Sequence, residues 1–185
     1  PFSDAMAEKA MELIGENIRR FVANRTDVEA AEAMMVGSLF AGIAFSFARL
    51  GNVHAMSHPV SAFFDVPHGV ANAVLLPVVA EYNALADHGR YYKIYNYISE
   101  IPAYEDEFEP MMLVDAIRSL CKAIGIPANL TEAINQAGKT GSISRETIEE
   151  KIEAMAADAM KSGNIAVNPR SSRQCDIEML YRKAL

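Results

Sequence analysis

A run of sixteen residues without a charged side chain, from Ala33 to Ala48, restricts the possible folds of this sequence most strongly. The run is apolar on nearly every side of a helix, and such a helix lies either inside a protein or across a membrane. A bilayer requires about 20 apolar residues, so the run is too short to cross one. Its small residues suit close helix packing; they are Gly37, Ser38, Ala41 and Gly42. We therefore expect a buried central helix within a bundle.

The other strong patterns in the sequence also have the 3.6-residue period of α-helices. Thr26-Asp-Val-Glu29 has the spacing of a capping box and opens the central helix, which Gly51 ends. Pro59 and Pro77 lie inside two later helices and should distort them. No strand pattern or repeat is evident, so the fold class is predicted as all-α, one multi-helix bundle over 1–185. The expected helices cover 3–21, 26–50, the segment around 54–58, 67–82, 90–101, 110–124, 131–137, 144–162 and 172–184.

Three of the four histidines fall within fifteen residues: His54, His58 and His68. His54 and His58 are four residues apart, so on a helix their rings share one face. His68 follows a proline and precedes a glycine, which suits a turn that brings a third ring back toward the first two. Neutral imidazole is the commonest protein ligand for first-row metals, so three histidines beside Asp65 indicate a metal site. The alternative interpretation is that these are packing histidines with satisfied ring nitrogens.

Composition narrows the class of partner. The chain of 185 residues has a net charge of −7 and a pI near 5.1, so it has no basic surface for nucleic acid or an anionic membrane. Its two cysteines, Cys121 and Cys175, have neither metal-type spacing nor the density of a disulfide scaffold. A cytoplasmic metabolic protein with no membrane association is the resulting expectation.

Several known catalytic and nucleotide-binding motifs are incomplete or missing in this sequence. His54-Ala-Met-Ser-His58 has the paired histidines of a zinc protease, but Ala55 stands where that chemistry needs a glutamate. Neither a G-x-S-x-G nucleophile motif nor a Rossmann glycine fingerprint is present. The segment Gly138-Lys-Thr-Gly-Ser lacks the spacing of a phosphate-binding loop. The residues alone therefore do not establish catalysis.

The pattern G-x2-H-x3-H-P…P-H-G-V-A-N-A-V-L-L-P, beginning at Gly51, resembles the C-terminal signature of the iron-containing alcohol dehydrogenases. The similarity is greatest to the branch of lactaldehyde reductase, propanediol dehydrogenase and butanol dehydrogenase. It extends over essentially the whole chain, because further family positions are matched at 82–83, 125–127 and 168–170. Ser61 departs from the pattern, since the family usually has glycine there. The resemblance implies the helical C-terminal domain of the dehydroquinate synthase-like fold.

Carried over residue by residue, the resemblance makes His54 and His68 metal ligands and His58 a catalytic group beside the substrate. The implied metal is Fe²⁺, with Zn²⁺ as the other possibility. The family's two remaining ligands have the spacing Asp-x3-His and lie upstream of the matched region. No Asp-x3-His occurs in this chain, so the resemblance implies half a metal site.

The family also has an N-terminal nucleotide-binding domain, which the resemblance implies is absent from this chain. The implied function is NAD(P)-dependent oxidation of a primary alcohol or diol, or reduction of the aldehyde, by metal-assisted hydride transfer. NAD or NADP would be bound mainly by the missing domain, which makes that domain a partner, and the chain alone would be inactive. The substrate would be a small alcohol or aldehyde, and a homo-oligomer is expected. The alternative is a non-catalytic helical module that uses the histidine cleft for metal-stabilised assembly or partner binding.

Overall fold

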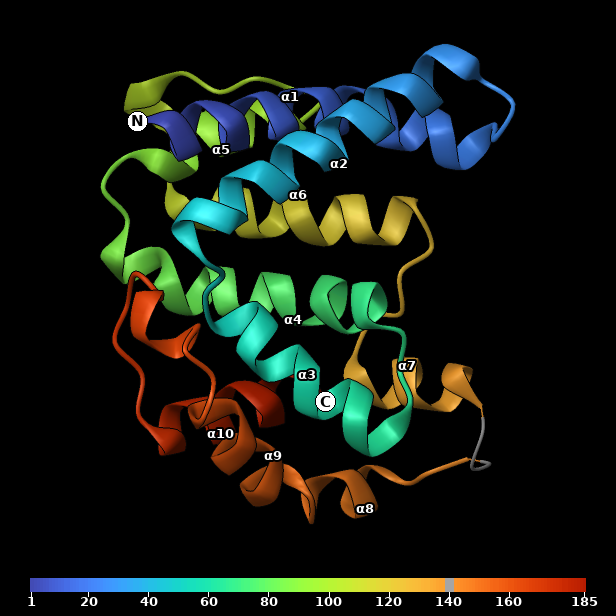
Figure 1. Cartoon of the computed structure of the whole chain (residues 1–185), viewed down its shortest axis with the longest axis vertical. Coiled ribbons are helices and arrows are strands. Elements are labelled where there is room, and N and C mark those ends of the chain that lie inside the picture. The colour runs from blue at the N-terminus through green and yellow to red at the C-terminus, as the bar shows by residue number, and fades with distance from the viewer. Residues whose placement is uncertain (139–141) are drawn as a thin grey trace. The chain divides into compact units, whose positions relative to one another are not determined.

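The computed structural model describes residues 1–138 and 142–185, and within these ranges the chain contains helices and no strand (Figure 1). The predicted all-α fold class is confirmed. The glycine-containing turn at 138–142 falls largely outside the described residues. The α-helices are α1 (Phe2–Ala23), α2 (Val28–Ala48), α3 (Asn52–Phe64), α4 (His68–Asn83), α5 (Arg90–Ile98), α6 (Pro110–Ala123), α7 (Leu130–Ala137), α8 (Arg145–Glu149), α9 (Ile152–Met160) and α10 (Gln174–Ala184). Three short 3-10 helices are η1 (Ala84–Ala86), η2 (Glu105–Glu107) and η3 (Ile165–Val167).

Contacts between these helices divide the chain into two compact units. Unit 1 comprises residues 1–49 and 87–124 and contains α1, α2, α5 and α6. Unit 2 comprises residues 50–86 and 125–185 and contains α3, α4 and α7 to α10. The contacts thus define two units where the sequence predicts one domain over 1–185. The single domain stays a prediction.

In unit 1 the long helices α1 and α2 pack along each other, and glycine allows their close approach. A Cβ atom added at Gly37 would lie 2.8 Å from Cγ1 of Ile14. The prediction that α2 is a buried central helix is wrong for this chain, since its buried residues are Ala30, Gly37 and Ala44 alone among the described positions. Large apolar side chains of α2 lie on the surface instead, including Leu39 at 61% exposure and Phe47 at 72%. The apolar composition of α2 indicates that another surface should cover it, but does not indicate whether that surface belongs to this chain.

The start of α2 differs from the predicted capping box. Asp27 is the N-cap residue, and its Oδ1 accepts a hydrogen bond from the backbone N–H of Ala30 at 3.0 Å. Thr26 instead donates its hydroxyl hydrogen to Oδ1 of Asn24 at 2.8 Å. The carboxylate competes better than the hydroxyl for the orphan N–H groups of a first turn, because it also carries the charge that the helix dipole favours.

Two helical segments, Val28–Ala48 and His68–Ala86, are long and apolar enough to cross a membrane by length and composition. This is weak evidence, because the core helix of a soluble protein meets the same criteria. The absence of membrane association therefore stays a prediction.

The exposed apolar face of α2 predicts self-association of the 185-residue chain. Replacing Leu39 with serine should shift the monomer–oligomer equilibrium toward monomer, because it removes a large apolar group from the middle of that face. Sedimentation velocity over a concentration series measures the shift. Leu85→Ser is the matched control, since Leu85 is an exposed leucine of unit 2 outside α2. Equal association of the two variants would show that α2 is not the self-associating surface.

The core of unit 2 forms where α3 and α4 pack against α9 and α10 (Figure 1). The 144–162 segment contributes an apolar face to this core, since Ile148, Ile152, Met155 and Ala159 have no exposed surface. The predicted single helix is wrong, however, because the segment divides into α8 and α9. The backbone N–H of Lys151 donates to the carbonyl of Ile148, three residues back, which tightens the chain into a turn between the two helices.

Candidate metal centre

Helices α3 and α4 of unit 2 bring the three predicted histidines together. His54 and His58 lie one turn apart on α3, and His68 is the first residue of α4. The ring centroids of His54 and His68 are 5.2 Å apart, as are those of His58 and His68, while His54 and His58 are 6.5 Å apart. The structure therefore places all three in one cluster, and their roles as ligands and catalytic group stay predictions.

The predicted turn before α4 also explains this arrangement. Asp65 ends α3 in the left-handed conformation, with φ 56°, and Pro67 rather than His68 is the N-cap residue of α4. Reversal of the chain over these residues returns His68 to the face of α3 that carries the other two rings. The predicted helix over 67–82 therefore begins one residue earlier than α4 does.

The side chain of Asn72 lies between two of the rings. Its Nδ2 is 3.2 Å from Nε2 of His54 and 3.0 Å from Nε2 of His68. The two Nε2 atoms therefore point at a common position. The Oδ1 atom of Asn72 is buried and has no hydrogen-bond partner among the described residues. The i, i+4 spacing of His68 and Asn72 on one helix was the signal in the sequence that Asn72 would reach the ring nitrogens.

A buried hydroxyl contacts the cluster from the opposite side of His68. Ser57 is fully buried, and its Oγ lies 3.4 Å from Nδ1 of His68 and 3.1 Å from the backbone oxygen of His54. No pattern in the sequence singles out Ser57, because its contact with His68 depends on how α4 packs against α3.

The surroundings of the rings are mainly apolar on the His54 side. A surface cavity of about 450 Å³ is lined there by Gly51, Val53, His54, Gly69, Asn72, Ala73 and Leu76. Partial burial lowers the pKa of His54 below its usual value, and the neighbouring rings of His68 and His58 lower it further. These effects favour the neutral form of His54, which is the form that binds metals.

His58 faces different surroundings. It is exposed and lines a second cavity of about 390 Å³ with Ala55, Pro59, Ala62, Asp158, Lys161 and Ser162. Lys161 and Asp158 are paired there through Nζ and Oδ1 at 2.6 Å. His58 is thus open to solvent on one side and stacked on His68 on the other, at an interplanar angle of 21°.

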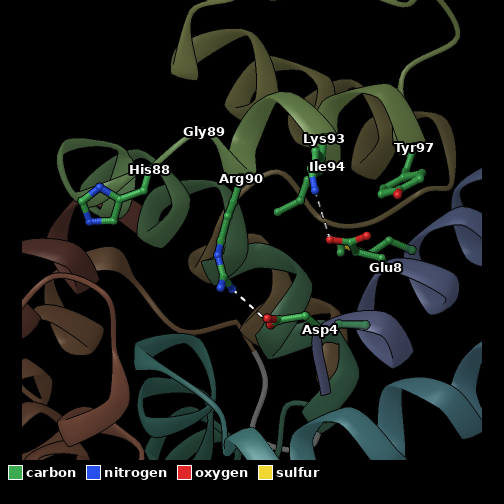
Figure 2. A pocket seen from close by; sticks show the side chains of 10 residues that line it. Asp4, Glu8, His88, Gly89, Arg90, Lys93, Ile94 and Tyr97 are labelled. Carbon is green, nitrogen blue, oxygen red and sulfur yellow. Dashed lines mark hydrogen bonds and ion pairs between the residues drawn. The ribbon is translucent and has the colours of Figure 1, made fainter. Parts of the chain in front are cut away.

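A further pocket, of about 270 Å³, lies in unit 1 between α1 and the start of α5 (Figure 2). The fourth histidine, His88, lines it, but the charged groups around it are already paired. Nη1 of Arg90 lies 3.3 Å from Oδ1 of Asp4, and Nζ of Lys93 lies 3.6 Å from Oε1 of Glu8 (Figure 2). These are exposed ion pairs of small energetic value, so this pocket is a weaker candidate site than the histidine cluster.

A network of amide side chains holds the start of α3 in place. Oδ1 of Asn168 accepts from the backbone N–H of Asn52 at 3.1 Å and from Nδ2 of Asn83 at 3.2 Å. Nδ2 of Asn168 donates to Oδ1 of Asn83 and to the carbonyl of Arg170, both at 2.7 Å. The contacts with Asn52 and Asn83 join segments that are 116 and 85 positions apart in the sequence, whereas the contact with Arg170 is local. Asn168 therefore ties the first turn of α3, which carries His54, to the end of α4.

The donor set of the cluster suits a borderline divalent metal, but the described residues do not complete it. Two imidazole Nε2 atoms converge on one position, and the orphaned Oδ1 of Asn72 shows that the polar groups there are not all satisfied by one another. No group of three or more His, Cys, Asp or Glu side chains in the described residues is arranged to hold a metal ion. The geometry therefore fits His54 and His68 as two ligands of a metal site, and this role stays a prediction.

Comparison with known proteins identifies the family. The family model for the C-terminal region of Fe-containing alcohol dehydrogenases matches residues 1–185. The chain belongs to the iron-containing alcohol dehydrogenase family. It is 37% identical over 185 residues to the 1,3-propanediol dehydrogenase of Citrobacter freundii, covering 100% of this chain and 45% of that protein. It is 35% identical over 183 residues to the lactaldehyde reductase of Escherichia coli K12, covering 98% of this chain and 44% of that protein.

Solved structures of this family agree with the fold. A 1,3-propanediol oxidoreductase aligns with a TM-score of 0.86 and 37% identity, covering 100% of this chain and 46% of that one.

Relatives named for their cofactor include an NADPH-dependent butanol dehydrogenase of Clostridium saccharobutylicum and an NAD-dependent methanol dehydrogenase of Bacillus methanolicus, each 32% identical. They are matched over 44% and 46% of their lengths. The chain thus spans less than half of these iron-containing alcohol dehydrogenases and corresponds to their C-terminal domain.

Proposed function

We propose that this chain is the metal-binding domain of an NAD(P)-dependent alcohol dehydrogenase, which oxidises a primary alcohol or diol, or reduces the aldehyde, by metal-assisted hydride transfer. The observation that carries the proposal is the convergence of two imidazole Nε2 atoms, of His54 and His68, on one position. Membership of an iron-containing family supports Fe²⁺ as the ion, and imidazole also suits Zn²⁺. When bound, the ion would supply Lewis-acid polarisation of the substrate oxygen.

The side chains of the cluster then have distinct tasks. His54 and His68 hold the ion, and the mainly apolar lining of the cavity beside His54 accommodates the carbon chain of a small alcohol. His58 is exposed and stacked on His68. It can therefore exchange a proton with solvent and also lie beside the hydroxyl of an alcohol bound at the cluster. We assign His58 to proton relay or to positioning of that hydroxyl.

The remaining parts of the enzyme lie outside these 185 residues in this proposal. NAD or NADP is bound by an N-terminal nucleotide-binding domain, which also completes the metal site. Cofactor names among the relatives support both nicotinamide forms and do not favour one. The acidic charge and the two free cysteines support a cytoplasmic protein that binds neither nucleic acid nor membranes. The exposed apolar side chains of α2 support a homo-oligomer.

A fusion protein tests the proposal. It joins the N-terminal region of the Citrobacter freundii 1,3-propanediol dehydrogenase to residue 1 of this chain, replacing the region that the chain matches. After loading with Fe²⁺, the fusion protein should oxidise 1,3-propanediol with NAD⁺ or NADP⁺, and the 185-residue chain alone should not. Metal binding without any alcohol oxidation would favour the non-catalytic alternative.

Replacing His58 with alanine in the fusion protein should lower kcat by roughly 10²–10⁴-fold, because that is the usual contribution of a general acid or base. The metal content should stay the same, since His58 is not a ligand in this proposal. Steady-state kinetics and metal analysis of the same preparation measure both quantities. Loss of the metal together with the activity would show that His58 is a ligand instead.

A further inference from the structure

The hydroxyl of Ser57 has a single hydrogen and two neighbours that can interact with it. Its Oγ lies 3.1 Å from the backbone oxygen of His54 and 3.4 Å from Nδ1 of His68. The Ser57 hydroxyl donates this hydrogen to the backbone oxygen of His54, which can only accept. The Oγ atom is then an acceptor toward His68, and Nδ1 of His68 carries the hydrogen between them.

A second contact on the other side of the ring leads to the same assignment. Nδ2 of Asn72 is a donor and lies 3.0 Å from Nε2 of His68, so this ring nitrogen must be an acceptor. A neutral imidazole has one N–H and one lone pair. Both contacts thus place the hydrogen on Nδ1 and the lone pair on Nε2, the atom that faces the position shared with Nε2 of His54.

We propose that Ser57 is a positioning residue that fixes His68 as the Nδ1–H tautomer, so that its Nε2 lone pair is available to a divalent cation. The inference rests on the proposed metal-binding function, which gives the Nε2 lone pair its use. Full burial of Ser57 on α3 supports the role, because water cannot replace the hydroxyl as the acceptor. Partners of this kind on the second ring nitrogen orient metal-binding histidines and raise their affinity for the ion.

Nuclear magnetic resonance of the imidazole nitrogens tests the tautomer directly, without metal, on the 185-residue chain. The spectra are recorded at about pH 8, which is above the ordinary pKa of a histidine side chain, about 6.5. His68 should show the Nδ1–H form, with its signals identified by their loss in His68→Ala. In Ser57→Ala the ratio of Nδ1–H to Nε2–H should fall by about tenfold, as expected for loss of one net hydrogen bond.

Ser61→Ala is the matched control. Ser61 lies one turn further along α3, and its Oγ is also buried but has no hydrogen-bond partner among the described residues. This variant should leave the tautomer of His68 unchanged. An Nε2–H form of His68 in the unmodified chain, or equal spectra for Ser57→Ala and Ser61→Ala, would overturn the inference.

Zinc titration of the fusion protein supplies the second measurement. Ser57→Ala should weaken Zn²⁺ binding by roughly 10–100-fold, and Ser61→Ala should not change it. The fusion protein could bind no zinc while the His68 tautomer of the 185-residue chain still shifts on Ser57→Ala. That result would contradict the proposed function and support the orienting role of Ser57. Unchanged zinc affinity in Ser57→Ala, with normal binding by the unmodified fusion protein, contradicts the role of Ser57 in metal binding.

Discussion

The fusion protein is expected to hold close to one divalent ion per chain, whereas the 185-residue chain alone is expected to hold little. The isolated chain offers the Nε2 atoms of His54 and His68, and water must complete the coordination. Losing two protein ligands should reduce affinity by more than the roughly 10–100-fold that loss of an outer-shell partner costs. Metal analysis after dialysis, on equal amounts of the two proteins, measures the difference.

Substitution of His68 tests whether the metal ion bound by the fusion protein lies at the proposed site. His68→Ala in the fusion protein should abolish stoichiometric binding, because a single imidazole from this chain would remain. His88→Ala is the control, since His88 is the histidine that lines the separate pocket in unit 1 (Figure 2). Stoichiometric metal in the chain alone, or full metal content in the His68→Ala fusion, would show that the ligand assignment is wrong.

The convergence of the histidines was predictable because it depends on local geometry. Four-residue spacing places His54 and His58 on one face of α3, and a Pro-His-Gly turn reverses the chain immediately before His68. Neither step requires knowledge of distant contacts. Helical periodicity was equally local, and it located α1, α2, α4 and α6 to within about two residues at each end.

Features that depend on packing between distant segments could not be predicted. The exposure of α2 is one, because an apolar run indicates that a helix needs covering but not which part of a protein covers it. The contact of Ser57 with His68 is another, since it requires the packing of α4 against α3. The hydrogen bonds that Asn168 makes with Asn52 and Asn83, called the clamp below, are a third feature. Asn168 and Asn52 are more than a hundred positions apart, and the sequence indicated only that Asn168-Pro-Arg170 matches a family pattern.

Removing the clamp is expected to destabilise unit 2 substantially. Asn168→Ala would leave the backbone N–H of Asn52 and the amide of Asn83 without the partner they have in the folded chain. Each unsatisfied buried group costs about 1–3 kcal/mol, so we expect a loss of roughly 2–4 kcal/mol in the free energy of unfolding. Urea unfolding followed by circular dichroism measures the loss, and hydrogen exchange of α3 amides locates it.

Gly51→Ala should have an effect of similar size for a different reason. The residue has φ −91°, which any amino acid can adopt, so backbone strain does not explain the glycine. A Cβ atom at this position would instead lie 2.7 Å from Oδ1 of Asn168. The amide of Asn168 cannot move away without breaking its bonds to Asn52 and Asn83. Gly69→Ala is the control, because a Cβ atom there would meet nothing within 4 Å, and alanine in a helix should be neutral or stabilising by up to about 1 kcal/mol.

Combining the two substitutions distinguishes the clamp from two independent defects. Truncation of Asn168 removes the atom that the added Cβ would meet, so Gly51→Ala should cost little once Asn168 is alanine. The double variant should therefore be more stable than the sum of the single effects requires, with a coupling energy of about 1–3 kcal/mol. Additive effects would mean that Gly51 is needed for some other reason and that Asn168 does not set the position of the first turn of α3. Coupling would instead establish that glycine is required at position 51, three residues before His54, because the amide of Asn168 occupies the space of a side chain there.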